Sequence, residues 1–244
     1  MPHRFFIPAN SITPPTIHLD GDTAYQIRAV LRLRPGDEII VLDNSGLEWQ
    51  IALTEVNKNN VQGQIISQKS CQSEPKFDLS LYQATLKGQK FEWILQKGTE
   101  LGVSGFVPII CQRSVVRDLA VLAKRQTRSQ QIIREAAEQS GRGRLPWLQQ
   151  PYPFGEAMAQ VPAKDLIIIP WEEATGLSLK QVLTAAHGSI ALFIGPEGGF
   201  APEEIELAQR SGAMIVTLGP RILRAETAAI ATCAAIMYEM NEWR

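Results

Sequence analysis

The sequence is poor in cysteine and histidine, with three of each among 244 residues. Cys71, Cys111 and Cys233 lie far apart and form no CxxC pair or Cys/His cluster, which argues against a disulfide framework and a zinc site. No apolar run reaches the ~18 residues that a membrane-spanning helix needs. The first residues also lack the apolar core and cleavage site of a signal peptide. We therefore expect a cytoplasmic protein with no bound metal and no membrane contact.

The composition is that of a folded globular chain, with 45% hydrophobic and 20% charged residues. The net charge is only −1, but residues 113–144 carry eight basic and three acidic side chains, a local charge of +5. Such a stretch on a near-neutral protein indicates contact with a polyanion such as RNA. A solvated helix face would give the same pattern, so charge alone leaves both interpretations open.

Residues 1–70 are predicted to be rich in β-structure. Short apolar runs bounded by turn residues indicate strands at 38–42, 49–56 and 61–66, and a helix is expected at 22–31. These elements predict a small barrel with one helix. The polar stretch 70–76 is interpreted as a linker.

Residues 77–244 show alternating strand and helix patterns, which predict an α/β domain with a parallel sheet. Buried strands are expected at 79–84, 106–110, 166–169, 190–194 and 214–218. Helices are expected at 91–101, 124–139, 178–186, 202–210 and 225–239.

Two strand ends in the last fifty residues carry glycine and proline. The first segment is 190–200, IALFIGPEGGF, and the helix after it begins at Pro202 with Ala201 in place of the usual polar cap. The second is 216–228, VTLGPRILRAETA. Glycines at the carboxyl ends of parallel strands let the backbone approach a ligand, and open α/β sheets bind ligands at that edge. Neither segment is a P-loop or a GxGxxG fingerprint.

These two segments together resemble the RsmE family of 16S ribosomal RNA uracil-N3 methyltransferases, which belongs to the SPOUT superfamily. Further matching segments occur in the family's order along nearly the whole chain: HRFF at 3–6, VLR at 30–32, KGTELGV at 97–103, QRS at 112–114 and REAAEQSGR at 134–142.

The resemblance implies a PUA-like RNA-binding β-barrel at 1–70 and a SPOUT α/β domain at 77–244, with a parallel sheet and a C-terminal trefoil knot. It also implies S-adenosylmethionine (SAM) as cofactor, a homodimer with the active site at the subunit interface, and 16S ribosomal RNA of the 30S subunit as partner.

On this basis the cofactor would contact the strand-end loops, where glycines provide amides and space and apolar side chains provide a wall for adenine. Ordinary turns and core packing are the alternative interpretation. The expected contacts are Ile194, Gly195, Pro196, Gly198, Leu218, Gly219, Ile222, Leu223, Pro170 and Trp171.

Methyl transfer to a uracil nitrogen requires loss of the N3 proton, and hence a base or donors that stabilise charge on the ring carbonyls. We expect Arg224 to stabilise that charge, and Glu226 or Glu197 to act as base or to orient Arg224. The alternative is a first-turn carboxylate that interacts with the helix dipole beside a surface arginine.

Basic side chains in both parts of the chain are candidates for RNA contact, although any one of them could serve only solubility, and Arg134 could pair with Glu138 at i,i+4. The candidates are Arg4, Arg32, Arg113, Arg134, Arg142 and Arg144.

Two other functions remain open on the sequence alone. One is a SPOUT methyltransferase that acts on transfer RNA or on a ribose 2′-hydroxyl. The other is a non-catalytic RNA-binding factor for ribosome assembly, which would have no need of a SAM pocket.

Overall fold

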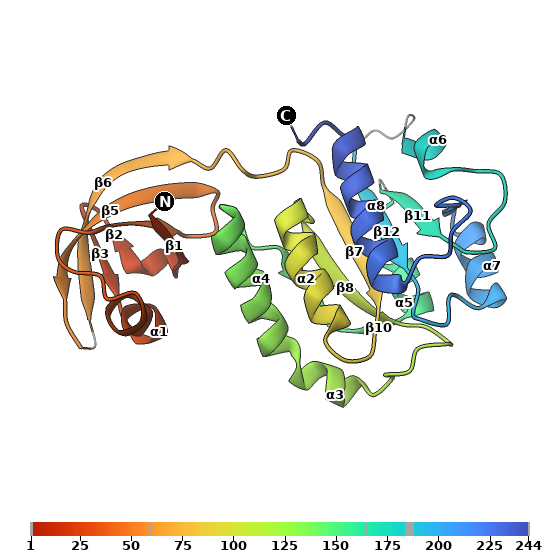
Figure 1. The fold of residues 1–244 in the computed structure, drawn as a ribbon, viewed down its shortest axis with the longest axis horizontal. Helices are drawn as coiled ribbons and strands as arrows, with labels where there is room; N and C mark the ends of the chain where they lie inside the picture. Colours follow the sequence, from red (N-terminus) through yellow and green to blue (C-terminus); the bar gives the residue numbers. More distant parts are fainter. Residues whose placement is uncertain (1, 59, 164, 184–187, 244) are drawn as a thin grey trace. The chain divides into compact units, whose positions relative to one another are not determined.

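The computed structural model describes residues 2–58, 60–163, 165–183 and 188–243. The chain forms two compact units (Figure 1). The first unit contains residues 1–74 and 137–145, and the second contains 75–136 and 146–244. The last turn of the helix at 126–140 and the loop after it are therefore part of the N-terminal unit.

The first unit is built on a six-stranded sheet. Its strand order is β1 (His3–Phe6), β4 (Glu38–Leu42), β5 (Leu47–Val56), β6 (Val61–Ser70), β3 (Thr16–Leu19) and β2 (Ile12–Thr13). β1 runs parallel to β4 and the other pairs are antiparallel. Alternate residues of β4 and β5, including Ile39, Val41, Ile51 and Leu53, form the core, as expected for a sheet with one buried face.

One helical segment packs on this core, because Ala24 and Ile27 lie in the same cluster. It consists of α1 (Gly21–Tyr25) and a π-helical continuation, η2 (Gln26–Val30). A short turn, η1 (Ala9–Ser11), precedes β2. The predicted helix at 22–31 and the three predicted strands are confirmed, whereas β1, β2 and β3 were missed.

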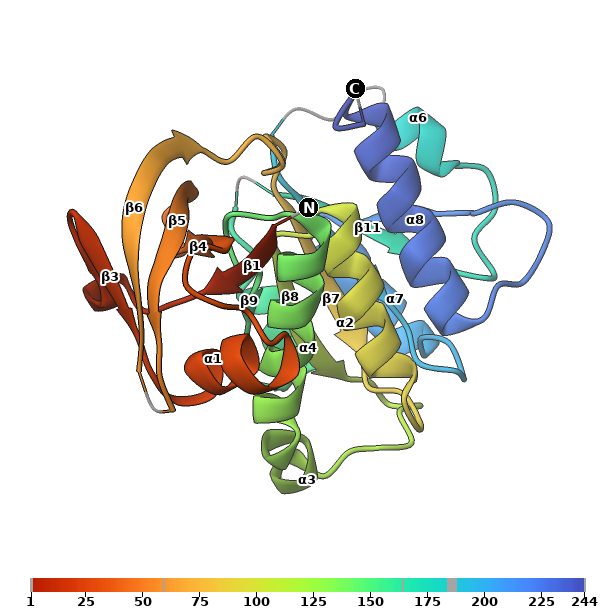
Figure 2. The same ribbon diagram turned by 60° about the vertical axis from the view of Figure 1, so that its left-hand side comes forward.

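The second unit is built on a parallel sheet with the order β10 (Tyr152–Pro153), β8 (Gly105–Ile110), β7 (Leu79–Ala84), β12 (Ile190–Ile194), β11 (Leu166–Pro170) and β13 (Met214–Val216). A further strand, β9 (Trp147–Leu148), also pairs with β8. Every residue of β7 and β12 is buried, because helices cover both faces of the sheet (Figure 2). The mixed α/β class and the parallel sheet are confirmed.

The helices of this unit pack on the two faces of the sheet. α2 (Lys90–Leu101) and α8 (Ala225–Glu239) lie side by side and share one core cluster. α5 (Phe154–Ala159) and α7 (Pro202–Arg210) contribute to the other cluster. The remaining helices are α3 (Leu119–Lys124), α4 (Gln126–Ser140) and α6 (Leu179–Leu183).

Several predicted boundaries were wrong. The helix expected at 124–139 is α4, which begins two residues later, at Gln126, and the short helix α3 before it was missed. The strand expected at 214–218 ends at Val216, because the chain then enters the Gly-Pro loop. The helix expected at 178–186 covers 179–183, and residues 184–186 lie outside the described part of the chain. The short helix α5 was missed.

Candidate active site

A cavity of about 700 Å³ lies at the carboxyl ends of β11, β12 and β13. This is the edge at which open α/β sheets bind ligands. Three loops form its wall, and the first residues of α2 and α8 complete it. Of the predicted cofactor contacts, the cavity is lined by Pro170, Trp171, Ile194, Gly195, Pro196, Leu218, Gly219, Ile222 and Leu223.

The predicted contact that does not line the cavity is Gly198, and its neighbour Gly199 lines it instead. Gly198 has another role, because the guanidinium of Arg113 donates a hydrogen bond to its carbonyl oxygen at 3.0 Å. Gly199 has a φ of +69°, and a Cβ there would overlap the carboxylate of Glu172. The positive φ is the reason for glycine at 199, because the exposed Glu172 side chain could move away from a Cβ.

A buried carboxylate holds the loop after β12 in place. Glu204 of α7 accepts hydrogen bonds from the backbone N–H groups of Ala201 and Gln112, both at 2.9 Å. The missing side-chain cap at Ala201 is confirmed, and Glu204 instead binds the N–H of this cap residue. The carboxylate therefore ties the cavity loop to the end of β8.

The cavity fits a ligand that has both polar and apolar surfaces. Trp171 lines it, and the indole Nε1 is buried without a hydrogen-bond partner among the described residues. A buried donor of this kind is costly unless an acceptor reaches it. Gly219, at φ +104°, has open space where a side chain would project. Ile194, Leu218 and Leu223 provide the apolar wall.

Of the proposed catalytic residues, Arg224 and Glu197 line this cavity, whereas Glu226 does not line it but pairs with Lys90, which does. Arg224 is exposed at the N-cap of α8 and lines the cavity. Glu226 Oε1 lies 3.2 Å from Nζ of Lys90, whereas its buried Oε2 has no partner among the described residues. Glu197 lines the cavity and accepts a hydrogen bond from the backbone N–H of Lys87 at 3.1 Å.

The charge state of Glu226 follows from its surroundings. Burial raises the pKa of this carboxyl, but its own backbone N–H, Lys90 and Arg224 outweigh that effect, so that its pKa lies below the ordinary value of 4.5. Glu226 is therefore an ionised carboxylate at neutral pH.

Lys90 was missed by the sequence analysis. It lies in the first turn of α2, where the helix dipole disfavours a cation. A lysine at such a position indicates a compensating anion, and Glu226 of α8 is that anion. The sequence indicates this ion pair only if a helix is predicted to begin at residue 90.

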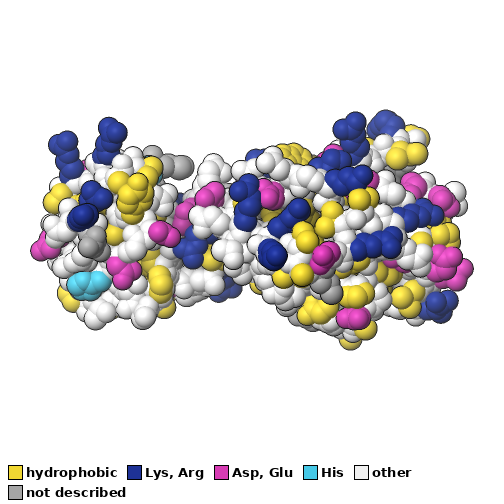
Figure 3. All heavy atoms as spheres, turned by 90° about the horizontal axis from the view of Figure 1, so that it is seen from below, with side chains coloured by type: hydrophobic (Ala, Val, Ile, Leu, Met, Phe, Trp, Pro, Cys, Tyr) yellow, Lys and Arg dark blue, Asp and Glu magenta, His cyan; other side chains and the backbone are white. Residues whose placement is uncertain are grey.

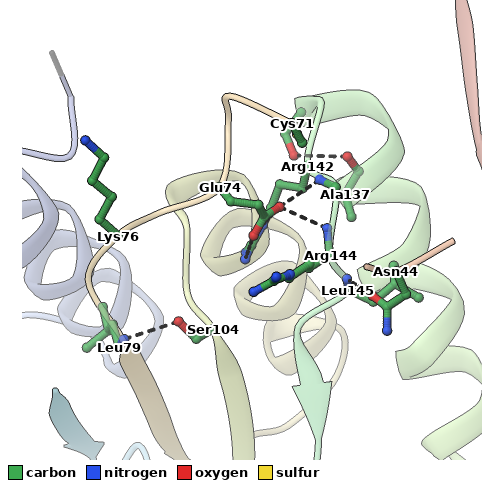
Figure 4. Close-up of polar contacts among 12 residues, drawn as sticks. Asn44, Cys71, Glu74, Lys76, Leu79, Ser104, Ala137, Arg142, Arg144 and Leu145 are labelled. Atoms are coloured by element: carbon green, nitrogen blue, oxygen red, sulfur yellow. Dashed lines mark hydrogen bonds and ion pairs between the residues drawn. The ribbon is translucent and has the colours of Figure 1, made fainter. Parts of the chain in front are cut away.

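The six arginines predicted to contact RNA have different surroundings. Arg4 pairs with Glu48 at 2.7 Å and donates to the carbonyl of Gly141, and Arg142 is buried and pairs with Glu74 at 3.2 Å (Figure 4). Both hold the first unit together.

Two of the other candidates are exposed in the first unit. Arg144 donates to the carbonyl of Ser45 at 3.0 Å. Arg32, at φ +57°, makes no hydrogen bond or ion pair with any described residue.

The last two candidates belong to the second unit. Arg113 is exposed beside the cavity loop, and Arg134 is half-buried on α4. Figure 3 shows Lys and Arg side chains scattered among Asp and Glu side chains on the face that it presents.

Two negative findings apply to the described residues. No helix among them is long and apolar enough to cross a membrane. No group of three or more His, Cys, Asp or Glu side chains within the described ranges could hold a metal ion.

Comparison with protein families defines the class of this fold and site. Residues 72–237 match the model of an RNA methyltransferase domain, and residues 27–66 match that of an RNA methyltransferase PUA domain. The chain thus combines the methyltransferase domain with the PUA domain of RNA-modifying enzymes.

Individual similar proteins identify the family within this class of RNA methyltransferases. A ribosomal RNA small subunit methyltransferase E of Bacillus subtilis is 32% identical, with 92% of this chain and 91% of that protein covered. The crystal structure of the Neisseria gonorrhoeae methyltransferase E bound to SAM matches with a TM-score of 0.90 at 32% identity, covering 98% of each chain. A Legionella pneumophila methyltransferase with bound SAM matches with a TM-score of 0.88 at 30% identity and the same coverage. The chain belongs to the family of ribosomal RNA small subunit methyltransferase E.

Proposed function

We propose that this chain is a SAM-dependent methyltransferase that modifies N3 of a uracil in the 16S ribosomal RNA of the 30S subunit. The observation that carries the proposal is the cavity of about 700 Å³ at the carboxyl ends of β11, β12 and β13. The SAM-bound relatives of 30–32% identity support this assignment of the cavity.

The three loops of the cavity would hold the cofactor. The glycine-containing backbone at 195–199 and 218–219 offers amides, and the orphan Nε1 of Trp171 offers a donor to a polar edge of the cofactor. Bound SAM supplies an electrophilic methyl group on a sulfonium. The resemblance also implies that these loops form a trefoil knot, which stays a prediction.

The polar residues at the cavity mouth would act on the uracil. The exposed guanidinium of Arg224 can donate to a ring carbonyl and stabilise the negative charge that develops when N3 loses its proton. Glu226 is ionised and half-buried, and Lys90 holds its carboxylate in place. The negative charge of this carboxylate would orient the guanidinium of Arg224. Glu197, one of two exposed carboxylates that line the cavity, would accept the N3 proton.

The N-terminal unit would bind the RNA. Its exposed arginines Arg32 and Arg144, together with Arg113 beside the cavity, are the candidates for phosphate contact. We also propose residues 1–70 as the PUA-like RNA-binding domain and 77–244 as the SPOUT domain.

We further propose that the chain acts as a homodimer. Apolar side chains are exposed near the end of α8 and beside the cavity, at Tyr238, Trp243 and Ile222, and such surface is often covered by a partner. Light scattering on the eluting protein should give about 54 kDa, twice the 27.0 kDa of one chain. A mass of one chain at micromolar concentration would contradict the proposal.

The deciding experiment is methyl transfer from labelled SAM to 30S subunits purified from cells that lack this protein. The RNA is digested and its nucleosides are identified by mass spectrometry. Label in 3-methyluridine is the expected result. Label in another nucleoside would overturn the N3 assignment, and SAM binding without label on 30S subunits or naked ribosomal RNA would overturn the enzymatic proposal.

A further inference from the structure

A second cavity lies in the methyltransferase unit, between the sheet and α5. Its volume is about 210 Å³, and it shares no lining residue with the cavity at the carboxyl ends of β11, β12 and β13. Side chains from β7 and β8 form its floor, and the segment 147–162 forms its sides.

Two largely buried residues with hydroxyl groups line this cavity. Ser80 and Tyr82 of β7 are only 8% and 5% exposed, and no described residue makes a hydrogen bond to either hydroxyl. The ring of Tyr82 is fixed by stacking on Phe193, with centroids 4.2 Å apart. Burial and the charge of Asp165 raise the pKa of Tyr82, so its hydroxyl remains a donor. Because neither hydroxyl is used within the described part of the chain, both are free to bond a polar group that enters the cavity.

An exposed aromatic ring borders the same cavity. The indole of Trp147 is 42% exposed and lies flat against the backbone of Gly105, where any Cβ would overlap the ring. Glycine at 105 therefore makes room for the indole on the first residue of β8. Tyr152 adds a second aromatic side chain, and the amides of Gln149 and Gln160 line the rim.

This combination matches one kind of ligand. A flat apolar ring can stack on Trp147, while its polar edge meets the hydroxyl and amide groups. Unstacked RNA bases are recognised in this way, by stacking on aromatic side chains and hydrogen bonds to their edges. We propose that this cavity binds a nucleobase of the ribosomal RNA other than the methylated uracil. The inference rests on the proposed function, because it requires an RNA substrate.

The test measures the Kd of the full-length, SAM-loaded protein for 30S subunits that lack the modification. Trp147→Ala removes the stacking ring and should weaken binding about tenfold. The double variant Ser80→Ala/Tyr82→Phe removes only the two hydroxyls and should weaken binding at least threefold. Trp93→Ala is the matched control, because Trp93 is 44% exposed on α2 and outside both cavities; its Kd should stay within twofold of the wild type.

A second readout identifies the ligand. The complex with 30S subunits is irradiated with ultraviolet light and digested, and the peptide that contains Trp147 should carry a nucleotide adduct. The Kd for SAM should be unchanged in every variant.

Each outcome has one meaning. Wild-type Kd in both variants and no adduct, with normal methyl transfer by the wild type, would overturn this inference and leave the proposed function intact. If Trp147→Ala does not fold, the double variant decides. Binding to 30S subunits without methyl transfer by the wild type would overturn the proposed function, whereas the effects of the variants on Kd would still test the cavity.

Discussion

At the scale of single residues, the pair of Glu226 and Lys90 fixes a charge beside the cavity. The pKa of Glu226 lies below the ordinary value of 4.5, so this carboxylate is charged at neutral pH. A base with such a low pKa removes a proton weakly, since general-base catalysis is most efficient near the working pH. We therefore assign to Glu226 the role of orienting Arg224.

The first prediction concerns Glu226→Gln, which keeps the shape and removes the charge. We expect kcat for methyl transfer to fall about 100-fold, with the Kd for SAM within twofold of the wild type. Because the pKa is lowered, the wild-type profile should show no bend from Glu226 between pH 5.5 and 8. A bend in that range that disappears in Glu226→Gln would contradict the assigned charge state. Glu239→Gln, at the other end of α8, is the control.

The second prediction concerns Arg4 and Glu48, which form a largely buried ion pair at 2.7 Å. Burial raises the pKa of Glu48, but Arg4, Cys71 and Lys69 together lower it below 4.5. A lowered pKa in the folded state stabilises the protein above pH 4.5, and this stabilisation is lost as the pH falls through the folded-state value.

Arg4→Ala should therefore lower the free energy of unfolding at pH 7 by about 3 kcal/mol. This value is the low end of the range for breaking a buried ion pair, because Lys69 remains near Glu48. The difference from wild type should shrink as the pH falls below 4.5. Urea unfolding at pH 7, 5, 4 and 3 measures it, with Arg34→Ala as an exposed control. A difference that is independent of pH would exclude the pair as the cause.

At the scale of elements, the loop after α4 is organised around one carboxylate of the linker. Oε1 of Glu74 accepts backbone hydrogen bonds from Gly143 at 2.7 Å and Arg144 at 3.0 Å, while Oε2 pairs with the buried Arg142 (Figure 4). The N–H of Leu145 donates to the side chain of Asn44 at 2.6 Å. The loop is therefore fixed to the linker and to the turn before β5.

The third prediction follows from this arrangement. Glu74→Ala leaves Arg142 and two backbone N–H groups without this acceptor, and should lower the free energy of unfolding by about 3 kcal/mol. Glu74→Gln retains one acceptor oxygen and should cost about half as much. Thermal and urea unfolding measure both. Equal stability of Glu74→Ala and the wild type would show that the loop does not depend on the carboxylate.

The elements also show what the sequence could predict. β7 and β12 are buried on both faces, so each appears as an apolar run between polar segments. The two-residue strands β2, β9 and β10 are too short to carry a pattern. The break between α3 and α4 falls in Lys-Arg-Gln at 124–126, all good helix formers, so local propensity does not explain it.

The sequence indicated the residues of the cavity more clearly than the arginines that are available for RNA contact. Parallel strands bring their carboxyl ends to one edge, so two Gly-Pro strand ends could be placed in one site. By contrast, an arginine looks the same in sequence whether it is free or paired. Arg142 and its partner Glu74 are 68 residues apart, and no local pattern connects them.

At the scale of the whole molecule, the net charge is only −1, so RNA binding must depend on local contacts of a few basic side chains. Arg4 and Arg142 pair within the first unit, so the exposed Arg32 and Arg144 remain the strongest candidates there. A protein that neutralises phosphates releases counterions, and the logarithm of its binding constant falls with the logarithm of salt concentration, by about 0.7 per contact on single strands.

The fourth prediction uses this slope. Arg32→Gln/Arg144→Gln should weaken binding to 30S subunits at 100 mM salt and reduce the magnitude of the slope by about 1.4, that is, about 0.7 for each lost contact. Arg210→Gln is the control, because Arg210 is exposed on α7 and pairs only loosely with Glu206 at 3.7 Å. Binding is measured by filter retention from 50 to 300 mM salt. Weaker binding with an unchanged slope would mean that these arginines support the fold of the first unit and do not contact phosphates, and an unchanged affinity would assign the RNA surface to other residues.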